Sequence, residues 1–193
     1  MTEKIVLDSD FISSFLAIES LGVPVLILGN HLIIPDVVYD ELIASKNEGW
    51  KAEIDKMISS KLVEKRNLDT GSMEVMKVFY TLTKHPESGY KLIDKGEAAA
   101  IALAVCEQGV LASNNLKDVE QYLERYDLPI ITTGTLLYDL FENGSYNKEN
   151  IEDIWQKMID RGCKLGARSF SEYLEKQGWK IKNKYDISSF ITK

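Results

Sequence analysis

Short apolar runs alternate with longer amphipathic segments along most of the chain, and this alternation predicts the secondary structure. Four runs have the length of buried strands: residues 4–7, 32–34, 110–113 and 128–132. Helical spacing of apolar positions predicts helices at residues 11–21, 37–43, 50–61, 73–82, 98–108, 116–126 and 136–142. Strands that alternate with such helices are typical of parallel sheets with right-handed crossovers. We therefore expect an α/β fold: a three-layer sandwich around a central, mostly parallel sheet.

Turn and capping residues set the expected boundaries of these elements. Gly22 is expected to end the first helix, Pro35 the second strand, and Asp36 to cap the helix that follows. Residues 62–71 form a connector with room for one more strand. Two further amphipathic helices are expected at residues 148–161 and 169–177. We divide the chain into a main domain, residues 1–145, and a helical extension, residues 146–193. The extension ends in a basic tail, which we interpret as a solvated end.

Composition and charge narrow the classes of function. The chain has 193 residues, with 23 Lys and Arg against 30 Asp and Glu, a net charge of −7. This balance argues against sequence-blind wrapping of nucleic acid, which needs clustered cations. Two distant cysteines without a CxxC pair exclude a disulfide framework and a cysteine-built zinc site. The N-terminus lacks a signal peptide and the apolar stretch at residues 21–28 is too short to span a bilayer, so we expect a cytoplasmic protein without a membrane partner.

Several carboxylates follow predicted strands, at the edge where parallel sheets usually bind their ligands. Asp8 and Asp10 follow the first predicted strand, and Asn115 follows a later one. Glu41 and Glu97 share helical faces with apolar residues. Carboxylates on such faces are costly unless they are paired or bound to a cation. Oxygen ligands of this kind suit Mg²⁺ or Mn²⁺ rather than zinc or copper.

Each of these acidic residues also has a simpler structural interpretation. Asp8 can cap the helix that follows the first strand. Glu97 stands three residues after Asp94, the spacing of a capping box. Glu41 can pair with a lysine at the rim, and Asp118 can be a solvated acid in the first turn of its helix. The ordered placement of all four around strand ends favours a shared site.

Five stretches in a fixed order carry a resemblance to a known family. They are residues 5–11 (IVLDSDF), 34–42 (IPDVVYDEL), 95–104 (KGEAAAIALA), 112–118 (ASNNLKD) and 131–137 (ITTGTLL). In these stretches the chain resembles PIN-domain proteins, a family that includes bacterial and archaeal toxin ribonucleases and related RNA-processing nucleases. The resemblance covers residues 1–145 and extends more loosely to residue 177. It implies that residues 1–145 form a PIN-like nuclease domain.

The resemblance also implies a site and a reaction. Asp8, Glu41 and Glu97 correspond to catalytic metal ligands of the family, whereas Asn115 stands where a fourth acid is usual. Asp118, one turn further on, is the candidate to replace that acid, directly or through water. The implied activity is hydrolysis of RNA phosphodiester bonds by a Mg²⁺- or Mn²⁺-dependent endoribonuclease of the toxin–antitoxin type. The implied partners are RNA, an antitoxin-like inhibitor protein and, by analogy, a second copy of the chain.

The net acidic charge leaves few lysines and arginines to contact RNA. Two clusters stand out in the sequence: Lys61, Lys65 and Arg66 in the connector, and the lysines between Lys180 and Lys184 in the tail. We expect RNA contacts at these two places.

Two other functions remain open at this point. Asp8-Ser9-Asp10 after a strand is also the beginning of an aspartate-nucleophile phosphatase of the haloacid dehalogenase type, although the downstream acidic motif of that class is missing. A PIN-like domain without turnover, which binds RNA or a protein partner, is the stronger alternative. Asn115 and the net charge of −7 favour it.

Overall fold

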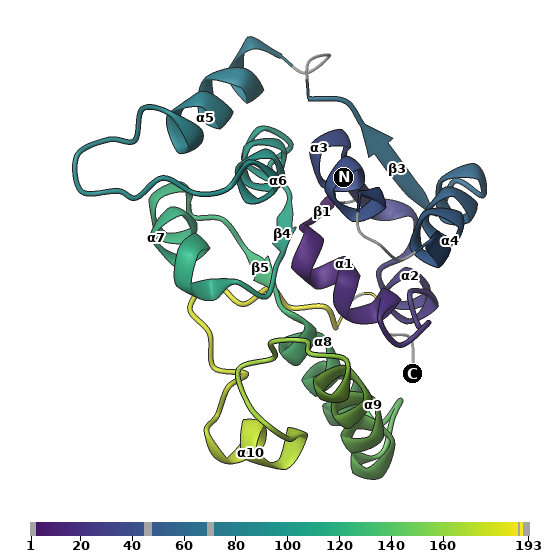
Figure 1. Cartoon of the computed structure of the whole chain (residues 1–193). Helices are drawn as coiled ribbons and strands as arrows, with labels where there is room; N and C mark the ends of the chain where they lie inside the picture. The colour runs from purple at the N-terminus through teal and green to yellow at the C-terminus, as the bar shows by residue number, and fades with distance from the viewer. Residues whose placement is uncertain (1–2, 45–47, 69–71, 189, 191–193) are drawn as a thin grey trace.

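The computed structural model describes residues 3–44, 48–68, 72–188 and 190. Within these ranges, five parallel strands form one sheet in the order β3-β2-β1-β4-β5 (Figure 1). Val6 of β1 lies opposite Ile33 of β2 and Leu111 of β4. The strands are β1 Ile5–Leu7, β2 Leu32–Pro35, β3 Val63–Arg66, β4 Val110–Ala112 and β5 Ile130–Ile131. The expected α/β sandwich with a parallel sheet is confirmed.

Helices cover both faces of the sheet, because alternate strand residues face opposite sides. Val6, Ile33 and Leu111 join one core with α5, α6 and α7. Their neighbours Ile5 and Leu7 join the other core with the remaining helices. The helices are α1 Ser9–Leu16, α2 Gly22–Leu28, α3 Asp36–Ile43, α4 Glu48–Ser59, α5 Met73–Thr83, α6 Lys95–Cys106, α7 Leu116–Tyr126, α8 Thr133–Glu142, α9 Lys148–Asp160 and α10 Phe170–Glu175.

The region after the first strand differs from the expected single helix. Helix α1 ends at Leu16, and Gly22 begins the separate helix α2 instead of ending the first one. Pro24 lies in the first turn of α2, where its missing N–H has no helical acceptor to lose. The apolar run of α2 packs into the core with one side and leaves Leu26 85% exposed on the other. Glycine followed by a continuous apolar run concealed this helix in the sequence.

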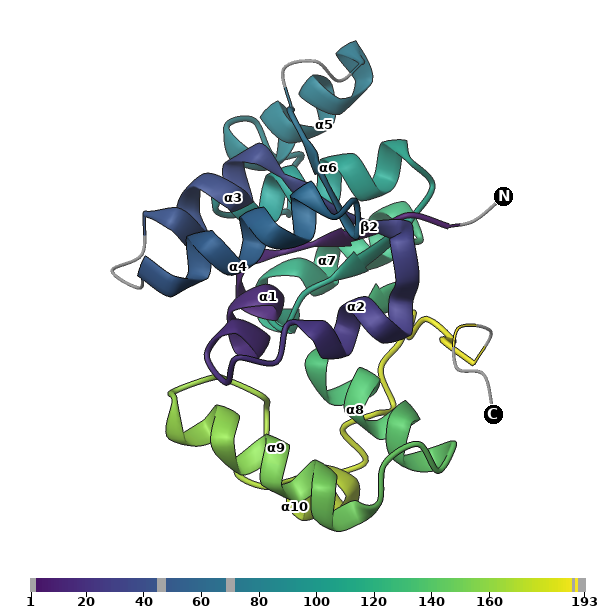
Figure 2. The same ribbon diagram turned by 90° about the vertical axis from the view of Figure 1, so that its right-hand side faces the viewer.

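The C-terminal helices lie below the sheet in Figure 2, and their large side chains belong to the same core as α1 and α2. Trp155 of α9 and Phe170 of α10 are fully buried there. The basic tail is not the solvated end that we expected. It runs back to β5, where the Ile130 N–H donates to Asn183 O at 2.9 Å and the Tyr185 N–H donates to Ile130 O at 2.8 Å. In the described part of the chain, no helix is both long and apolar enough to cross a membrane.

Candidate active site

Acidic residues from three segments line one cavity at the carboxyl edge of the sheet. Its volume is about 710 Å³. Asp8 and Asp10 follow β1, Glu97 lies in the first turn of α6, and Asp118 lies in the first turn of α7. We call this the acidic cavity. Parallel strands bring their carboxyl ends to one edge, so residues more than 100 positions apart meet here.

Asp8 is buried at the base of the cavity, with only 1% of its surface exposed. Its Oδ1 accepts a hydrogen bond from the Ser9 N–H at 2.7 Å, so it also caps α1, and its Oδ2 accepts one from the Ser113 hydroxyl at 2.8 Å. Burial raises the pKa of Asp8 well above its usual value, and the charge of Asp10 raises it further. Asp8 therefore both caps α1 and lines the acidic cavity.

Asp10 and Asn114 tie the ends of β1 and β4 together. The Asn114 N–H donates to Asp10 Oδ1 at 3.0 Å. The Asn114 side-chain amide donates to Ser14 Oγ at 3.1 Å and to Thr133 Oγ1 at 3.0 Å, and its oxygen accepts from the Thr133 N–H at 2.8 Å. These bonds connect β4 with α1 and α8. They fix the wall from which the acidic side chains project.

Glu97 and Asp118 are joined by Asn115. The Asn115 Nδ2 donates to Glu97 Oε1 and, at 2.7 Å, to Asp118 Oδ2. Burial raises the pKa of Glu97 to about 7, and the charge of Asp118 contributes to the rise. Asp94 makes no side-chain capping bond to α6, so the capping box that we considered for Glu97 is not formed.

Glu41 of α3 lies in an adjoining cavity, together with Asp94, Lys95 and Gly96. That cavity shares Ser9 and Glu97 with the acidic cavity. Gly96 allows the close approach of α3 and α6, because a Cβ at this position would collide with the Glu41 carboxylate. Burial raises the pKa of Glu41. In the described part of the chain Glu41 forms no ion pair, so the rim pairing with lysine is not seen.

Three basic side chains that sequence reasoning missed also line the acidic cavity: Lys117, Arg161 and Lys164. None of them forms an ion pair with a residue of the described ranges. Arg161 and Lys164 follow α9, about 25 residues beyond the last predicted motif at residues 131–137, and only the packing of α9 against the sheet domain brings them here. Their spacing in the sequence carries no signal of this role.

The basic groups that the sequence suggested are largely engaged elsewhere. Lys65 lies 3.7 Å from the centre of the Tyr39 ring. Arg66 pairs with Glu64 at 2.6 Å, and Lys182 and Lys184 pair with Glu124 and Asp139 at 2.7 and 2.5 Å. Their contact with RNA stays a prediction.

The acidic cavity offers the oxygen ligands that a hard divalent cation prefers. Asp8, Asp10, Glu97 and Asp118 supply carboxylate oxygens, none of which is paired with a lysine or arginine among the described residues. The cage is not closed: in the part of the chain that the structure covers, no three His, Cys, Asp or Glu side chains are grouped tightly enough to hold an ion. The Asn115 amide occupies the position between Glu97 and Asp118. The ligand type therefore suits a divalent ion such as Mg²⁺ or Mn²⁺. The side chains have to rotate before their oxygens can coordinate one ion together.

Comparison with known families agrees with this geometry. A family model, DUF3368, described as a PIN domain, matches residues 4–178. The chain therefore belongs to the PIN-domain family, whose members are generally nucleases. More narrowly, it is a DUF3368-type PIN domain. The family assignment removes the support for the phosphatase alternative. No curated protein and no solved structure is similar enough to the chain to count as a match.

Proposed function

We propose that this protein is a divalent-metal-dependent endoribonuclease of the toxin type. The observation that carries the proposal is the meeting of Asp8, Glu97 and Asp118 around one cavity, where none of them forms an ion pair with a described residue. Unpaired carboxylates at this density disfavour one another's charge, and a divalent cation reverses that balance. Membership of the PIN-domain family supports the same reading.

In this proposal Asp8, Glu97 and Asp118 hold the ion, with Asn115 as a neutral oxygen donor and Glu41 at the adjoining cavity. Bound Mg²⁺ or Mn²⁺ supplies an activated water and stabilises charge on the leaving oxygen. Ser113 keeps Asp8 oriented through its 2.8 Å hydrogen bond. Asn115 has to release its amide from Glu97 and turn its oxygen toward the ion.

Lys117, Arg161 and Lys164 are proposed to bind the phosphates of RNA. They line the same cavity as the carboxylates and have no acidic partner in the described ranges. A chain with a net charge of −7 can bind a polyanion only through such local cations. The extension proposed for residues 146–193 would then contribute Arg161 and Lys164 to the site. We also propose that an antitoxin-like protein covers the acidic cavity, and that enzyme and substrate RNA meet in the cytoplasm.

Cleavage of a labelled single-stranded RNA pool by the full chain tests this proposal. With Mg²⁺ or Mn²⁺ we expect cleavage, with EDTA none, and in Asp8→Asn a loss of at least about 100-fold. Asp153→Asn is the matched control, because Asp153 is an exposed aspartate of α9 whose partner is Lys157. Metal should also raise the melting temperature, since a ligand at 100 times its Kd adds about 2.7 kcal/mol. Cleavage that persists in EDTA or in Asp8→Asn would contradict the proposal.

A binding module without turnover is the second candidate. The hydrogen bonds from Asn115 to both Glu97 and Asp118 favour it, because they satisfy these acids without a cation. This candidate predicts RNA or protein binding with neither cleavage nor a metal-induced rise in melting temperature. The same two measurements therefore separate the candidates.

A further inference from the structure

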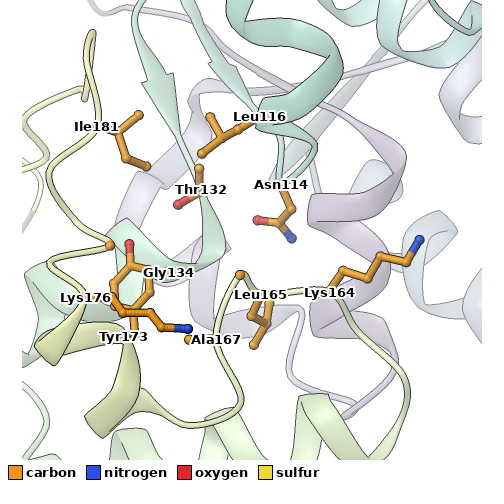
Figure 3. A pocket seen from close by; sticks show the side chains of 12 residues that line it. Asn114, Leu116, Thr132, Gly134, Lys164, Leu165, Ala167, Tyr173, Lys176 and Ile181 are labelled. Atoms are coloured by element: carbon orange, nitrogen blue, oxygen red, sulfur yellow. The ribbon is translucent and has the colours of Figure 1, made fainter.

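A second cavity opens beside the acidic cavity, and we call it the side pocket (Figure 3). Asn114 and Lys164 line both cavities. In Figure 3 the Lys164 side chain extends away from Tyr173, out of the pocket. The two spaces are therefore neighbours, and Lys164, which forms no ion pair within the described ranges, lies between them.

The side pocket is small and its walls are mostly apolar. Its volume is about 210 Å³, below the roughly 300–1,000 Å³ of pockets for drug-sized ligands. Leu116 follows β4, Leu165 and Ala167 come from the loop before α10, and Ile181 comes from the tail. Walls of this size and character suit a single flat ring system.

Tyr173 supplies the pocket with a polar group that lacks a partner. Only 5% of the residue is exposed, and its hydroxyl is buried without a hydrogen bond of normal geometry to any described residue; Thr132 is the polar side chain that interacts with it. Figure 3 shows this hydroxyl on the side of the ring that faces Thr132. Gly134 and Gly178 hold the ring in place, since a Cβ on either would collide with it. A buried hydroxyl without a partner costs about 1–3 kcal/mol, so it requires an explanation.

The other polar side chains of the pocket are already engaged. The Asn114 amide is bound to Ser14 and Thr133. Thr132 Oγ1 accepts from the Thr135 N–H at 3.0 Å, and Lys176 pairs with Glu172 at 2.5 Å. This leaves the Tyr173 hydroxyl inside the pocket and the Lys164 ammonium at its mouth to meet a ligand.

We propose that the side pocket binds one nucleobase of the RNA strand whose backbone crosses the acidic cavity. Proteins that read single-stranded RNA hold splayed bases between flat or apolar side chains and bond to their polar edges. Here the apolar walls pack against the two faces of the base, and the Tyr173 hydroxyl forms a hydrogen bond with its polar edge. Lys164 contacts the phosphate between this base and the acidic cavity. The inference rests on the proposed function, because it takes RNA as the substrate.

The first experiment sequences the ends that the full chain produces from a random single-stranded RNA pool with Mg²⁺. We expect a preference for one base at a fixed distance from the cut. In Tyr173→Phe this preference falls about fivefold at that position, the effect of one lost hydrogen bond. Tyr80→Phe, at a partly exposed tyrosine of α5, is the matched control and keeps the preference. Cleavage without a base preference, or an unchanged preference in Tyr173→Phe, would overturn the pocket and leave the nuclease proposal standing.

A second experiment measures the binding of short RNA homopolymers to the full chain in EDTA, by calorimetry. We expect affinities that differ among the four bases, and a difference that shrinks about fivefold in Tyr173→Phe. Lys164→Ala should weaken binding of all four equally and lower the salt slope by about 1. Base-dependent binding without cleavage would support the pocket while the nuclease proposal fails. Equal affinity for all four bases would overturn the pocket.

A loss of base preference in Tyr173→Phe cannot be explained by misfolding of the variant. Tyr173→Phe keeps the ring between Gly134 and Gly178 and removes only a hydroxyl that makes no hydrogen bond of normal geometry within the described ranges. The melting temperature of this variant should therefore equal or exceed that of the wild type. A lower melting temperature would mean that the hydroxyl has a structural partner in the protein, and would overturn its assignment to a ligand.

Discussion

The acidic cavity and the side pocket share a wall at Asn114 and are built in opposite ways. The acidic cavity gathers four carboxylates whose burial raises the pKa of at least Asp8, Asp10 and Glu97. The side pocket contains apolar walls and one hydroxyl without a partner. Both are costly to the folded state, one through charge and the other through a missing hydrogen bond. Such costs at one edge of an otherwise well-packed sheet are typical of sites that await a ligand.

Substitution of Asn114, which lines both cavities, should have the largest effect on stability. Asn114→Ala removes the bonds to Ser14 and Thr133 and leaves the Thr133 N–H without its 2.8 Å partner. We expect the free energy of unfolding to fall by about 2–3 kcal/mol in urea denaturation. Asn150→Ala, at an exposed position of α9, should stay within about 0.5 kcal/mol of the wild type. Equal stability of both variants would mean that the two cavities do not depend on this wall.

A further acid in the acidic cavity, at position 115, should sharpen the contrast between the two cavities. Asn115→Asp replaces the amide that joins Glu97 and Asp118 with a further negative charge. We expect a lower melting temperature in EDTA from like-charge repulsion, and a Mg²⁺ affinity about tenfold higher in a melting titration. Asn150→Asp adds the same charge outside the cavity, in the first turn of α9, and should neither lower the melting temperature in EDTA nor move the Mg²⁺ midpoint. A Mg²⁺ midpoint that does not move would exclude residue 115 from the ion site.

Of the acidic cavity and the side pocket, the pH should act on the acidic cavity, with a smaller effect than the two substitutions above. The pKa of Glu97 rises from 4.5 to about 7 on folding, because burial disfavours its charged form. The folded state therefore holds this proton more tightly than the unfolded state, and the associated stability is lost as the pH rises from 4.5 through about 7. We expect a fall on the order of 1 kcal/mol in EDTA, since solvent screens a half-buried carboxylate. Glu97→Gln should flatten this slope, and saturating Mg²⁺ should reduce it. A stability that increases over this range would contradict the raised pKa.

The two cavities also differ in how far the sequence predicted them. Helix α7 has the expected bounds because its apolar spacing is regular, and the parallel-strand rule placed Asp8 and Asn115 near one edge. Helix α2 was missed because Gly22 precedes an apolar run without helical periodicity. Arg161 and Tyr173 were missed because neither stands in a local pattern. Their positions depend on the packing of α9 and α10, which no spacing in the sequence encodes.

The tail that pairs with β5 has a consequence for the behaviour of the chain in solution. β5 is the last strand of the sheet, and its outer backbone groups at Ile130 are satisfied by Asn183 and Tyr185. An uncovered edge strand is a template for pairing with another chain. The family match ends at residue 178, so a chain cut there would keep the residues of the acidic cavity and lose this cover. Residues 183–185 thus cover this edge of the sheet, and we expect a chain shortened at residue 178 to aggregate more readily than the full chain.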